Sequence, residues 1–314
     1  MASLKELSAR EEIVAPGHRL CPGCGAAIVS RMVTKAAKNP LVVACATGCL
    51  EVSTTIYPYT SWKSSFLHVA FENSAASLSG TEAAYRALKK KGKIKEDIRF
   101  ISFGGDGGTY DIGFQSLSGA LERGHRMLVI CYDNGAYMNT GIQRSSATPR
   151  GADTTTSPAG KEAYGKKEYP KDLTACVVAH DIPYAAQASP SHWNDLMKKV
   201  EKALEVDGPS FINVLSPCPL GWRYPGEESI ELARLAVETG FWQLYEVENG
   251  VYKMNYNPKE RKPIREWLEK QGRFRHLFTP ANEHILQELQ EYVDKKWDRL
   301  LKLCSITEEA NKTK

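Results

Sequence analysis

The segment GGDGGTYDIGFQSLSGALERGHRMLVICYDNGAYMNTG, residues 104–141, decides the fold of this 314-residue chain. An apolar run precedes its first glycines, and a second apolar run leads into Asp133 and Asn134. Between the two runs, Phe114 to Arg123 has the spacing of a helix. A strand, a helix and a strand in this order indicate a parallel βαβ unit.

Two more apolar runs have the same character, and each ends in a loop. They are LVVACATGC, residues 41–49, and PSFINVLSPCPLG, residues 209–221. Helices are expected over Ser74 to Lys90 and His192 to Glu205. This alternation predicts an α/β fold with a doubly wound, mostly parallel sheet. Ligands bind such sheets at the carboxyl ends of the strands, and the strand ends here carry Cys49, Asp106, Asn134 and Cys218.

The regions that flank these runs are less regular. The N-terminal arm is polar and is expected to be extended. Thr140 to Lys167 is rich in Thr, Ser, Gly and Pro, which predicts a functional or interface loop, with a simple linker as the alternative. Beyond Trp222 the signals weaken, although Glu283 to Leu303 has helical spacing and is expected to pack on the body or on a partner. We therefore expect a main domain over residues 1–225 and a helical C-terminal extension over residues 226–314.

Composition and charge exclude several classes of protein. The 41 Lys and Arg residues against 37 acidic residues give a net charge of +4, which is too small to indicate nucleic-acid binding. No run of about 18 apolar residues occurs and the N-terminal segment lacks the apolar core of a signal peptide, so we expect a cytoplasmic protein with no membrane span. In that compartment the eight cysteines are expected as core residues, metal ligands or catalytic groups rather than as disulfides.

The glycines around Asp106 have the features of a diphosphate site. Glycines let backbone amides approach a phosphate closely, and the helix that follows would present its N-terminal dipole to the anion. Asp106, the side-chain carbonyl of Asn134 and the backbone carbonyl of Ala136 would supply hard oxygen ligands for Mg²⁺. Taken alone, Gly-Asp-Gly is also a common turn.

Four cysteines lie in loops, where they are suited to bind a metal. Cys21 and Cys24 form a Cys-Pro-Gly-Cys loop, Cys49 follows a strand, and Cys218 lies in Ser-Pro-Cys-Pro. The spacing alone is compatible with zinc or with an iron–sulfur cluster, and a thioredoxin-like redox pair is a third option. The other four are expected to be core or incidental residues, namely Cys45, Cys131, Cys176 and Cys304.

The unit that runs from Gly-Asp-Gly to Asn resembles the motif of the thiamine-diphosphate enzymes. The resemblance implies that Asp106, Asn134 and the Ala136 carbonyl hold Mg²⁺. It also implies that the cofactor contacts Thr47, Gly48, His68, Gly105, Gly107, Met138 and Asn139. These enzymes need a glutamate against the aminopyrimidine ring, and that glutamate belongs to a separate pyrimidine domain. No second domain of that kind fits in this chain, so another subunit is expected to supply it.

Several motifs occur in order: CPGCG, ATGCLEV, the Gly-Asp-Gly unit, YMNTGIQRSSATP, TTTSP and SPCPLGW. Together, from about Gly17 to Gly250, they closely resemble the β subunit of the 2-oxoacid:ferredoxin oxidoreductases. The resemblance implies that residues 1–225 bind both thiamine diphosphate and one 4Fe-4S cluster, with the cluster held by Cys21, Cys24, Cys49 and Cys218. It implies oxidative decarboxylation of a small 2-oxo acid, with electrons passed singly to the cluster and on to ferredoxin. Partner subunits of α, γ or δ type would supply the glutamate and further clusters.

Two of the expected site residues could instead have a purely structural role. Asn139 matches the asparagine beside the reactive thiazolium carbon and would hydrogen-bond a developing oxyanion as the catalytic residue, or it would simply stabilise a turn. His68 would contact the diphosphate, or it would be a satisfied core histidine. Arg144 and the stretch Thr154 to Ser157 would close over the cofactor or face a partner.

Three positions bear on the substrate. Pyruvate-type relatives usually carry aromatic residues in the loop after residue 147 and a glutamate after Asp-Asn, whereas this chain has Arg150, Asp153 and Gly135. Extra charge and a vacated acidic position would suit a small dianion such as oxalate. We therefore expect oxalate, with pyruvate and coenzyme A as the alternative.

Two other classes of protein share part of these features. A non-redox thiamine decarboxylase or synthase would have the Mg²⁺ motif without a need for four cysteines. A zinc-stabilised interaction module would have the cysteines with a degenerate cofactor site. Each accounts for only one of the two groups of residues.

Overall fold

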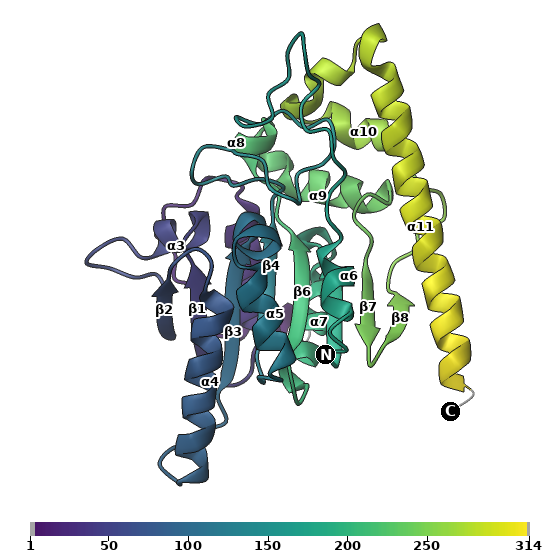
Figure 1. Cartoon of the computed structure of the whole chain (residues 1–314). Coiled ribbons are helices and arrows are strands. Elements are labelled where there is room, and N and C mark those ends of the chain that lie inside the picture. Colours follow the sequence, from purple (N-terminus) through teal and green to yellow (C-terminus); the bar gives the residue numbers. More distant parts are fainter. Residues whose placement is uncertain (1–3, 313–314) are drawn as a thin grey trace.

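The computed structural model describes residues 4–312, which form one eight-stranded sheet with helices on both faces (Figure 1). The strand order is β2-β1-β3-β4-β6-β5-β7-β8, in which the first six strands pair in parallel and β7 and β8 pair antiparallel. The bounds are β1 Leu41–Ala46, β2 Ser65–Val69, β3 Arg99–Gly105, β4 Leu128–Asp133, β5 Tyr184–Ala188, β6 Ser210–Leu215, β7 Tyr245–Glu248 and β8 Val251–Met254. The expected α/β, mostly parallel sheet is confirmed.

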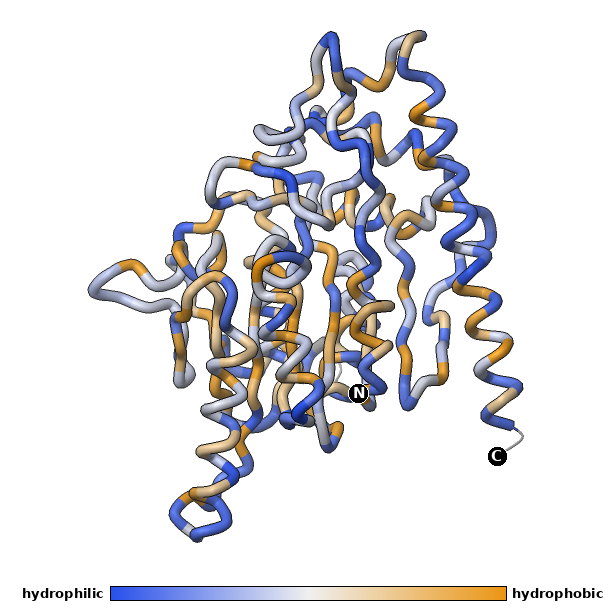
Figure 2. The backbone as a smooth tube through the Cα atoms, in the orientation of Figure 1, coloured by the Kyte–Doolittle hydropathy of each residue, from blue (hydrophilic) through white to orange (hydrophobic). Residues whose placement is uncertain are grey.

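The central strands are buried on both faces because helices cover each side. Every residue of β4 and β6 is buried, and their sequences LVICYD and SFINVL are almost continuously apolar, as strands of a covered parallel sheet are. Figure 2 shows the same strands as mostly apolar segments inside the molecule. The core is therefore two apolar layers, one on each side of the sheet.

Each layer has its own helices. The helices α4 (Ser74–Lys90), α5 (Phe114–Glu122) and α6 (Leu173–Val178) pack on one face. The helices α2 (Gly25–Ala36) and α7 (Trp193–Glu205) pack on the other. The sequence placed α4, α5 and α7 within one residue of these bounds, because their apolar spacing is regular.

The C-terminal part adds both helices and strands. It contains α9 (Ser229–Glu238), α10 (Ile264–Glu269) and the long α11 (Glu283–Lys312), which runs beside β8 (Figure 1). The helix expected over Glu283 to Leu303 is present but longer than predicted, since α11 continues to Lys312. The hairpin of β7 and β8 was not expected, and it extends the sheet antiparallel to β5.

The short elements complete the chain. α1 (Leu4–Ala9) is a helix, so the expectation of an extended N-terminal arm was wrong for these residues; Leu7 is buried in the core and draws the segment onto the body. The remaining short helices are α3 Cys49–Thr54, η1 Gly107–Asp111, η2 Pro190–His192, α8 Pro219–Trp222, η3 Gly226–Glu228, η4 Gly272–Leu277 and η5 Pro280–Asn282. No helix within residues 4–312 has the length and apolar character needed to cross a membrane.

The segment from Thr140 to Lys167 is an irregular loop held by isolated bridges, such as Thr154 with Ser157 and Ala159 with Tyr164. The buried Lys166 fixes it. Its ammonium donates to the carbonyl oxygens of Ser145 (3.1 Å), Ser146 (3.2 Å) and Thr148 (2.8 Å). These bonds tie the end of the loop to its beginning, and the Thr148 hydroxyl donates to the carbonyl of Gly135 (2.8 Å), just after β4, so the segment is not a free linker.

Candidate active site

The sheet order brings the chemically distinctive residues to one edge. The strands β1, β3, β4 and β6 are consecutive neighbours in the sheet. Cys49, Asp106, Asn134 and Cys218 each follow one of these strands directly or within three residues. Since parallel strands end at the same edge, residues that are up to 169 positions apart in the sequence become neighbours.

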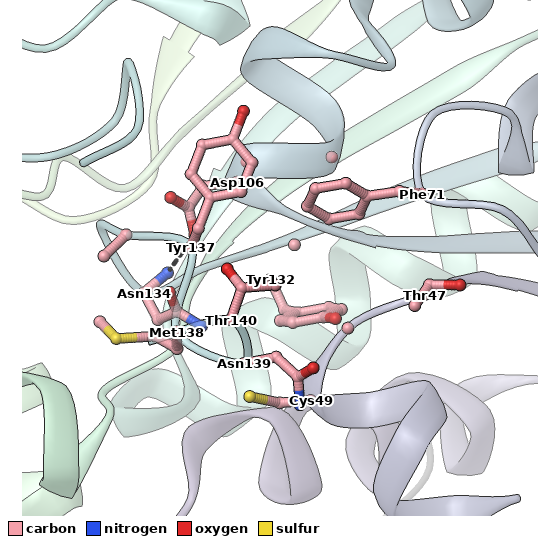
Figure 3. A pocket seen from close by; sticks show the side chains of 15 residues that line it. Thr47, Cys49, Phe71, Asp106, Tyr132, Asn134, Tyr137, Met138, Asn139 and Thr140 are labelled. Carbon is pink, nitrogen blue, oxygen red and sulfur yellow. Dashed lines mark hydrogen bonds between the residues drawn. The ribbon is translucent and has the colours of Figure 1, made fainter. Parts of the chain in front are cut away.

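A pocket opens at this edge (Figure 3). It contains ten of the residues that the sequence singled out: Thr47, Gly48, Cys49, Gly105, Asp106, Gly107, Asn134, Ala136, Met138 and Asn139. The other lining residues are Phe71, Gly108, Tyr132, Tyr137 and Thr140. The pocket therefore joins the Gly-Asp-Gly unit to the loop that carries Cys49.

The glycines of the Gly-Asp-Gly unit allow a tight turn beside an aromatic ring. A Cβ atom at Gly107 would lie 2.4 Å from a ring atom of Tyr137, so only glycine fits there. The chain then makes the π-helical turn η1 before α5 begins at Phe114. The helix expected over Phe114 to Arg123 did not include this turn; π turns of this kind often occur at functional sites.

Three oxygen atoms meet at the bottom of the pocket. The side-chain oxygen of Asn134 faces Oδ1 of Asp106 and the carbonyl oxygen of Ala136, at 2.9 and 2.8 Å. With the amide turned over, its nitrogen would donate to both of these oxygens. The backbone nitrogen of Asn134 also donates to Asp106 Oδ1 (3.3 Å; Figure 3). Three oxygens aimed at one another are the hard donor set that Mg²⁺ prefers, so these residues fit the ion.

The charges around Asp106 also favour a cation. Asp106 is fully buried, and its Oδ2 accepts a hydrogen bond from the Ser145 hydroxyl. Burial, reinforced by the neighbouring carboxylate of Asp133, raises the pKa of Asp106. Burial likewise raises the pKa of Asp133 to about 6, although Tyr110 and the amide of Gly135 donate to it. Two adjacent buried carboxylates are stabilised when a cation neutralises them.

Two buried cations lie near these carboxylates. Lys166 is 1% exposed, and burial lowers its pKa to about 8. Arg273 is 2% exposed, and burial lowers its pKa to about 9. The Arg273 guanidinium stacks 4.3 Å from the ring centroid of Trp222, and its Nε donates to Gln271 (2.9 Å). Neither cation was singled out in the sequence.

The cysteine loops pack against one another. The amide of Gly25, next to Cys24, donates to the carbonyl of Pro217, next to Cys218 (2.9 Å), and a Cβ atom at Gly25 would lie 2.6 Å from the Pro217 nitrogen. Across the same region, the side chain of Asn139 lies beside the Cys49 thiol and acts to lower its pKa. The three loops with cysteines are thus gathered between the pocket and α8.

The cysteines of this set influence the pKa values of one another's thiols electrostatically. Burial raises the pKa of Cys49 to about 11 and that of Cys218 to about 12, and Cys21 and Cys24 raise both pKa values further. Free thiolates here would repel one another, whereas bound iron or zinc would stabilise them. Nevertheless, in the part of the chain that the structure describes, no three His, Cys, Asp or Glu side chains are already gathered around one point. Cluster ligation by these cysteines stays a prediction.

The remaining cysteines lie elsewhere. Cys45 and Cys131 are fully buried within β1 and β4, as core cysteines are. Cys176 in α6 and Cys304 in α11 are partly exposed.

His68 is neither a core residue nor part of the pocket wall. Its side chain is 54% exposed, with Nε2 3.0 Å from the Thr47 hydroxyl and Nδ1 3.3 Å from the Glu51 carboxylate. It reaches the pocket only through Thr47, which lines it. Contact between His68 and a diphosphate therefore stays a prediction. The alternative that His68 is a core histidine is wrong, because its side chain is exposed.

The residues behind the oxalate expectation have other partners. Arg150 pairs with Glu288 (2.6 Å) and stacks on the rings of Tyr164 and Tyr169, outside the pocket wall. Asp153 pairs with Arg223 (2.8 Å). These two charges hold loops together and do not face the pocket.

Several residues of the site have no distinctive signal in the sequence. Phe71, Tyr132 and Tyr137 look like core aromatics, and only their position within four residues of a strand end hints at the pocket. Ser145 lies within the long loop, and its bond to Asp106 depends on how that loop folds back.

Comparison with known proteins identifies the family. A family model described as "Thiamine pyrophosphate enzyme, C-terminal TPP binding domain" matches residues 46–214. Pyruvate synthase subunit PorB of Thermotoga maritima is 54% identical over 311 residues, covering 97% of this chain and 96% of the relative. The same subunit of Methanocaldococcus jannaschii is 56% identical, covering 91% and 96%. Ketoisovalerate oxidoreductase subunit VorB of Pyrococcus abyssi is 46% identical, covering 94% of each chain.

A solved structure has the same fold. The 2-oxoglutarate:ferredoxin oxidoreductase from Magnetococcus marinus matches with a TM-score of 0.56 and 20% identity, covering 71% of this chain and 79% of that chain. The names of the close relatives favour the pyruvate alternative over oxalate. Because the family model spans more than half of the chain and close relatives match nearly all of it, the chain belongs to the β subunits of the thiamine-diphosphate-dependent 2-oxoacid:ferredoxin oxidoreductases, enzymes that work with partner subunits.

Proposed function

We propose that this β subunit acts in the oxidative decarboxylation of pyruvate, with Mg²⁺ and one 4Fe-4S cluster bound by its own residues and ferredoxin as the electron acceptor. Cys49 supports this function most strongly. It lines the same pocket as Asp106, so the proposed cluster ligand and the proposed Mg²⁺ ligand line one cavity. A non-redox thiamine enzyme has no need for that arrangement.

Asp106, Asn134 and the carbonyl of Ala136 would hold Mg²⁺, which would in turn bind the diphosphate. Gly105 and Gly107 would let the backbone approach the phosphates, and Thr47, Gly48 and Met138 would complete the contacts. The thiazolium ring, when bound, supplies an electron sink for decarboxylation. The chain's own contribution is to orient the cofactor and to exclude water with Phe71, Tyr132 and Tyr137.

Asn139 would act on the substrate as a hydrogen-bond donor. Its side chain lies in the pocket wall beside the Cys49 thiol. An amide there is suited to stabilise an oxyanion as charge develops on the substrate oxygen. It also lies between the cofactor position and the proposed cluster ligands.

Cys21, Cys24, Cys49 and Cys218 would each bind one iron of the cluster. The contact between Gly25 and Pro217 supports this, because it holds two of the three cysteine loops together. Electrons would leave one at a time through this cluster, and further clusters would belong to partner subunits. One partner, of α type or an equivalent, would supply the aminopyrimidine glutamate.

Pyruvate is preferred to oxalate for two reasons. Two close relatives are named pyruvate synthase subunits. In addition, Arg150 and Asp153, whose charges suggested a dianionic substrate, are paired with Glu288 and Arg223 outside the pocket. Coenzyme A would then accept the acyl group, and we place the enzyme in the cytoplasm.

The test is anaerobic purification of the chain with its bound partner subunits. We expect iron and sulfide in the ratio of 4Fe-4S clusters, and ferredoxin reduction that needs pyruvate, coenzyme A and thiamine diphosphate. A panel of pyruvate, 2-ketoisovalerate and oxalate decides the substrate. Equal or faster turnover of oxalate would overturn the pyruvate assignment, and zinc without iron would overturn the redox function itself.

A further inference from the structure

Arg273 is a buried cation without a carboxylate at contact distance. It belongs to η4 in the C-terminal part of the chain and is 2% exposed. In the described residues its guanidinium makes no ion pair; Nε donates to the neutral side chain of Gln271 (2.9 Å). Its other contacts are the faces of Trp222, Phe274 and Trp267, with ring centroids at 4.3, 5.0 and 6.0 Å. No described carboxylate forms an ion pair with this charge, and Asp133 and Asp106 act on it from a longer distance.

Trp222 connects this cation to the cysteine loop. Trp222 ends the four-residue helix α8, which starts directly after Cys218. The amide of Trp222 donates to the carbonyl of Cys218 (2.9 Å), and the amide of Gly221 donates to the Cys218 sulfur (3.4 Å). On its other side, the indole of Trp222 donates to the carbonyl of Asn134 (2.6 Å). Arg273 thus lies against the one ring that spans the cysteine loop and the Mg²⁺ loop.

The charge lies within electrostatic reach of the cysteine as well as of two carboxylates. Cys218, Asp133, Tyr224 and Asp106 all interact with the Arg273 guanidinium. A charge inside the protein is weakly screened, so it acts over a longer distance than a surface charge would. Burying a guanidinium without a partner is costly, and a neutral residue could stack on the same rings without that cost.

We propose that Arg273 raises the reduction potential of the 4Fe-4S cluster held by Cys218. The inference rests on the proposed function, since it needs the cluster. On reduction the cluster gains one electron from the decarboxylated substrate and becomes one unit more negative, without making or breaking a bond; ferredoxin later removes the electron. A fixed positive charge nearby stabilises the more negative form. Arg273 is therefore a positioning charge rather than a catalytic residue.

The test is a redox titration of the assembled complex followed by electron paramagnetic resonance. The signal of this cluster is assigned by its loss in Cys218→Ser. In Arg273→Gln we expect the oxidised form to be favoured at least tenfold, a shift of 59 mV or more towards negative potential for one electron. Arg273→Lys, titrated at about pH 6 so that the buried ammonium stays protonated, should restore most of the wild-type potential.

Arg273→His is a second test of the same charge, for use where the complex with Arg273→Gln does not assemble. Its planar ring can stack on Trp222, and at pH 8.5 a free imidazole is neutral, so it should shift the potential in the same direction. Arg223→Gln is the matched control. It removes the same charge beside the same helix, but its side chain is 49% exposed and paired with Asp153, so the potential should stay unchanged.

The outcomes separate the two proposals. Wild-type complex without iron and sulfide in this chain would overturn the proposed function. A cluster of full occupancy whose potential is the same in wild type, Arg273→Gln and Arg273→His would overturn the role of Arg273 alone. Equal shifts in Arg273→Lys and Arg273→Gln would also overturn it, because they would reflect lost packing rather than lost charge.

Discussion

The pocket has two unlike sides, an oxygen side and a sulfur side. The oxygen side, formed by Asp106, Asn134 and Ala136, stands on the paired strands β3 and β4, and its groups are already directed at one another. The sulfur side comes from three loops, and its cysteines are close enough to interact but not gathered around one point. Paired strands can arrange ligands before the ligand arrives, whereas loops are drawn together by what they bind. The two sides should therefore fail independently.

The largest effect is expected at the oxygen side. Asp106→Asn removes the buried carboxylate that would bind Mg²⁺, so ferredoxin reduction should fall by more than about a hundredfold. Thiamine diphosphate affinity, measured by calorimetry on the assembled complex, should fall with it. The brown absorbance of the cluster should remain. Loss of iron in this variant would mean that the two sides are not independent; Asp97→Asn, at a surface ion pair, is the control.

The converse change sharpens the comparison. Cys218→Ser should lower iron and sulfide content and abolish ferredoxin reduction, because sulfur ligation by Cys218 is lost. Thiamine diphosphate should still bind with an affinity within about tenfold of wild type, a difference of roughly 1.4 kcal/mol. Cys304→Ser, in α11 away from the pocket, should change neither property. Unchanged iron content in Cys218→Ser would contradict its role as a ligand.

A smaller effect concerns the anchor of the oxygen side. Burial lowers the pKa of Lys166 to about 8, below its ordinary value of about 10.4 in an unfolded chain. Between these values the unfolded state binds more protons, so the contribution of Lys166 to stability rises with pH, by at most about 1.4 kcal/mol per unit. The difference in unfolding free energy between wild type and Lys166→Met should therefore increase from pH 8 to 10.

The control for that measurement is Lys167→Met, which removes a neighbouring exposed lysine. It should show the wild-type dependence on pH. Lys166→Met should also be cleaved faster by proteases within residues 140–167, because three carbonyls lose their donor. A flat difference across pH 8 to 10 would show that Lys166 is not desolvated.

The smallest effect tests the charges that suggested oxalate. Arg150→Ala should cost about 1 kcal/mol in unfolding free energy, through the lost pair with Glu288 and the lost stacking on two tyrosines. The ratio of turnover with pyruvate to turnover with oxalate should not change. Glu288→Gln is the matched variant, and it should be milder because the stacking stays. A change in the ratio of pyruvate turnover to oxalate turnover would show that Arg150 does influence substrate selection.

The sequence predicted the central fold well and the periphery poorly, for physical reasons. Helices cover both faces of the strands β1, β3, β4 and β6. Their sequences are therefore almost continuously apolar and easy to recognise. The strand β5, YAAQA, is short and made of small residues, and β7 and β8 have four residues each, which gives no clear period. The helix α1 depends on packing against the body.

The site shows the same division. Residues in local motifs could be singled out, because Gly-Asp-Gly and Cys-Pro-Gly-Cys have their distinctive residues within a few positions, and the structure places the Gly-Asp-Gly unit in the pocket wall. Arg273 was missed because its place is set by tertiary packing: it comes from a segment 55 residues beyond Cys218 and touches that loop only through Trp222. His68 was placed near the cofactor by resemblance, yet its side chain lies beside the pocket.

The contact between Gly25 and Pro217 joins two cysteine loops that are synthesised at different times. About 190 residues separate the two, so at 5–20 residues per second the first cysteine pair leaves the ribosome roughly 10–40 s before its counterpart exists. During that interval Cys21 and Cys24 are ordinary thiols open to oxygen and to stray metals. The proposed cluster could therefore be completed only after Cys218 has been translated, and expression hosts should be judged by their maturation machinery as much as by their yield.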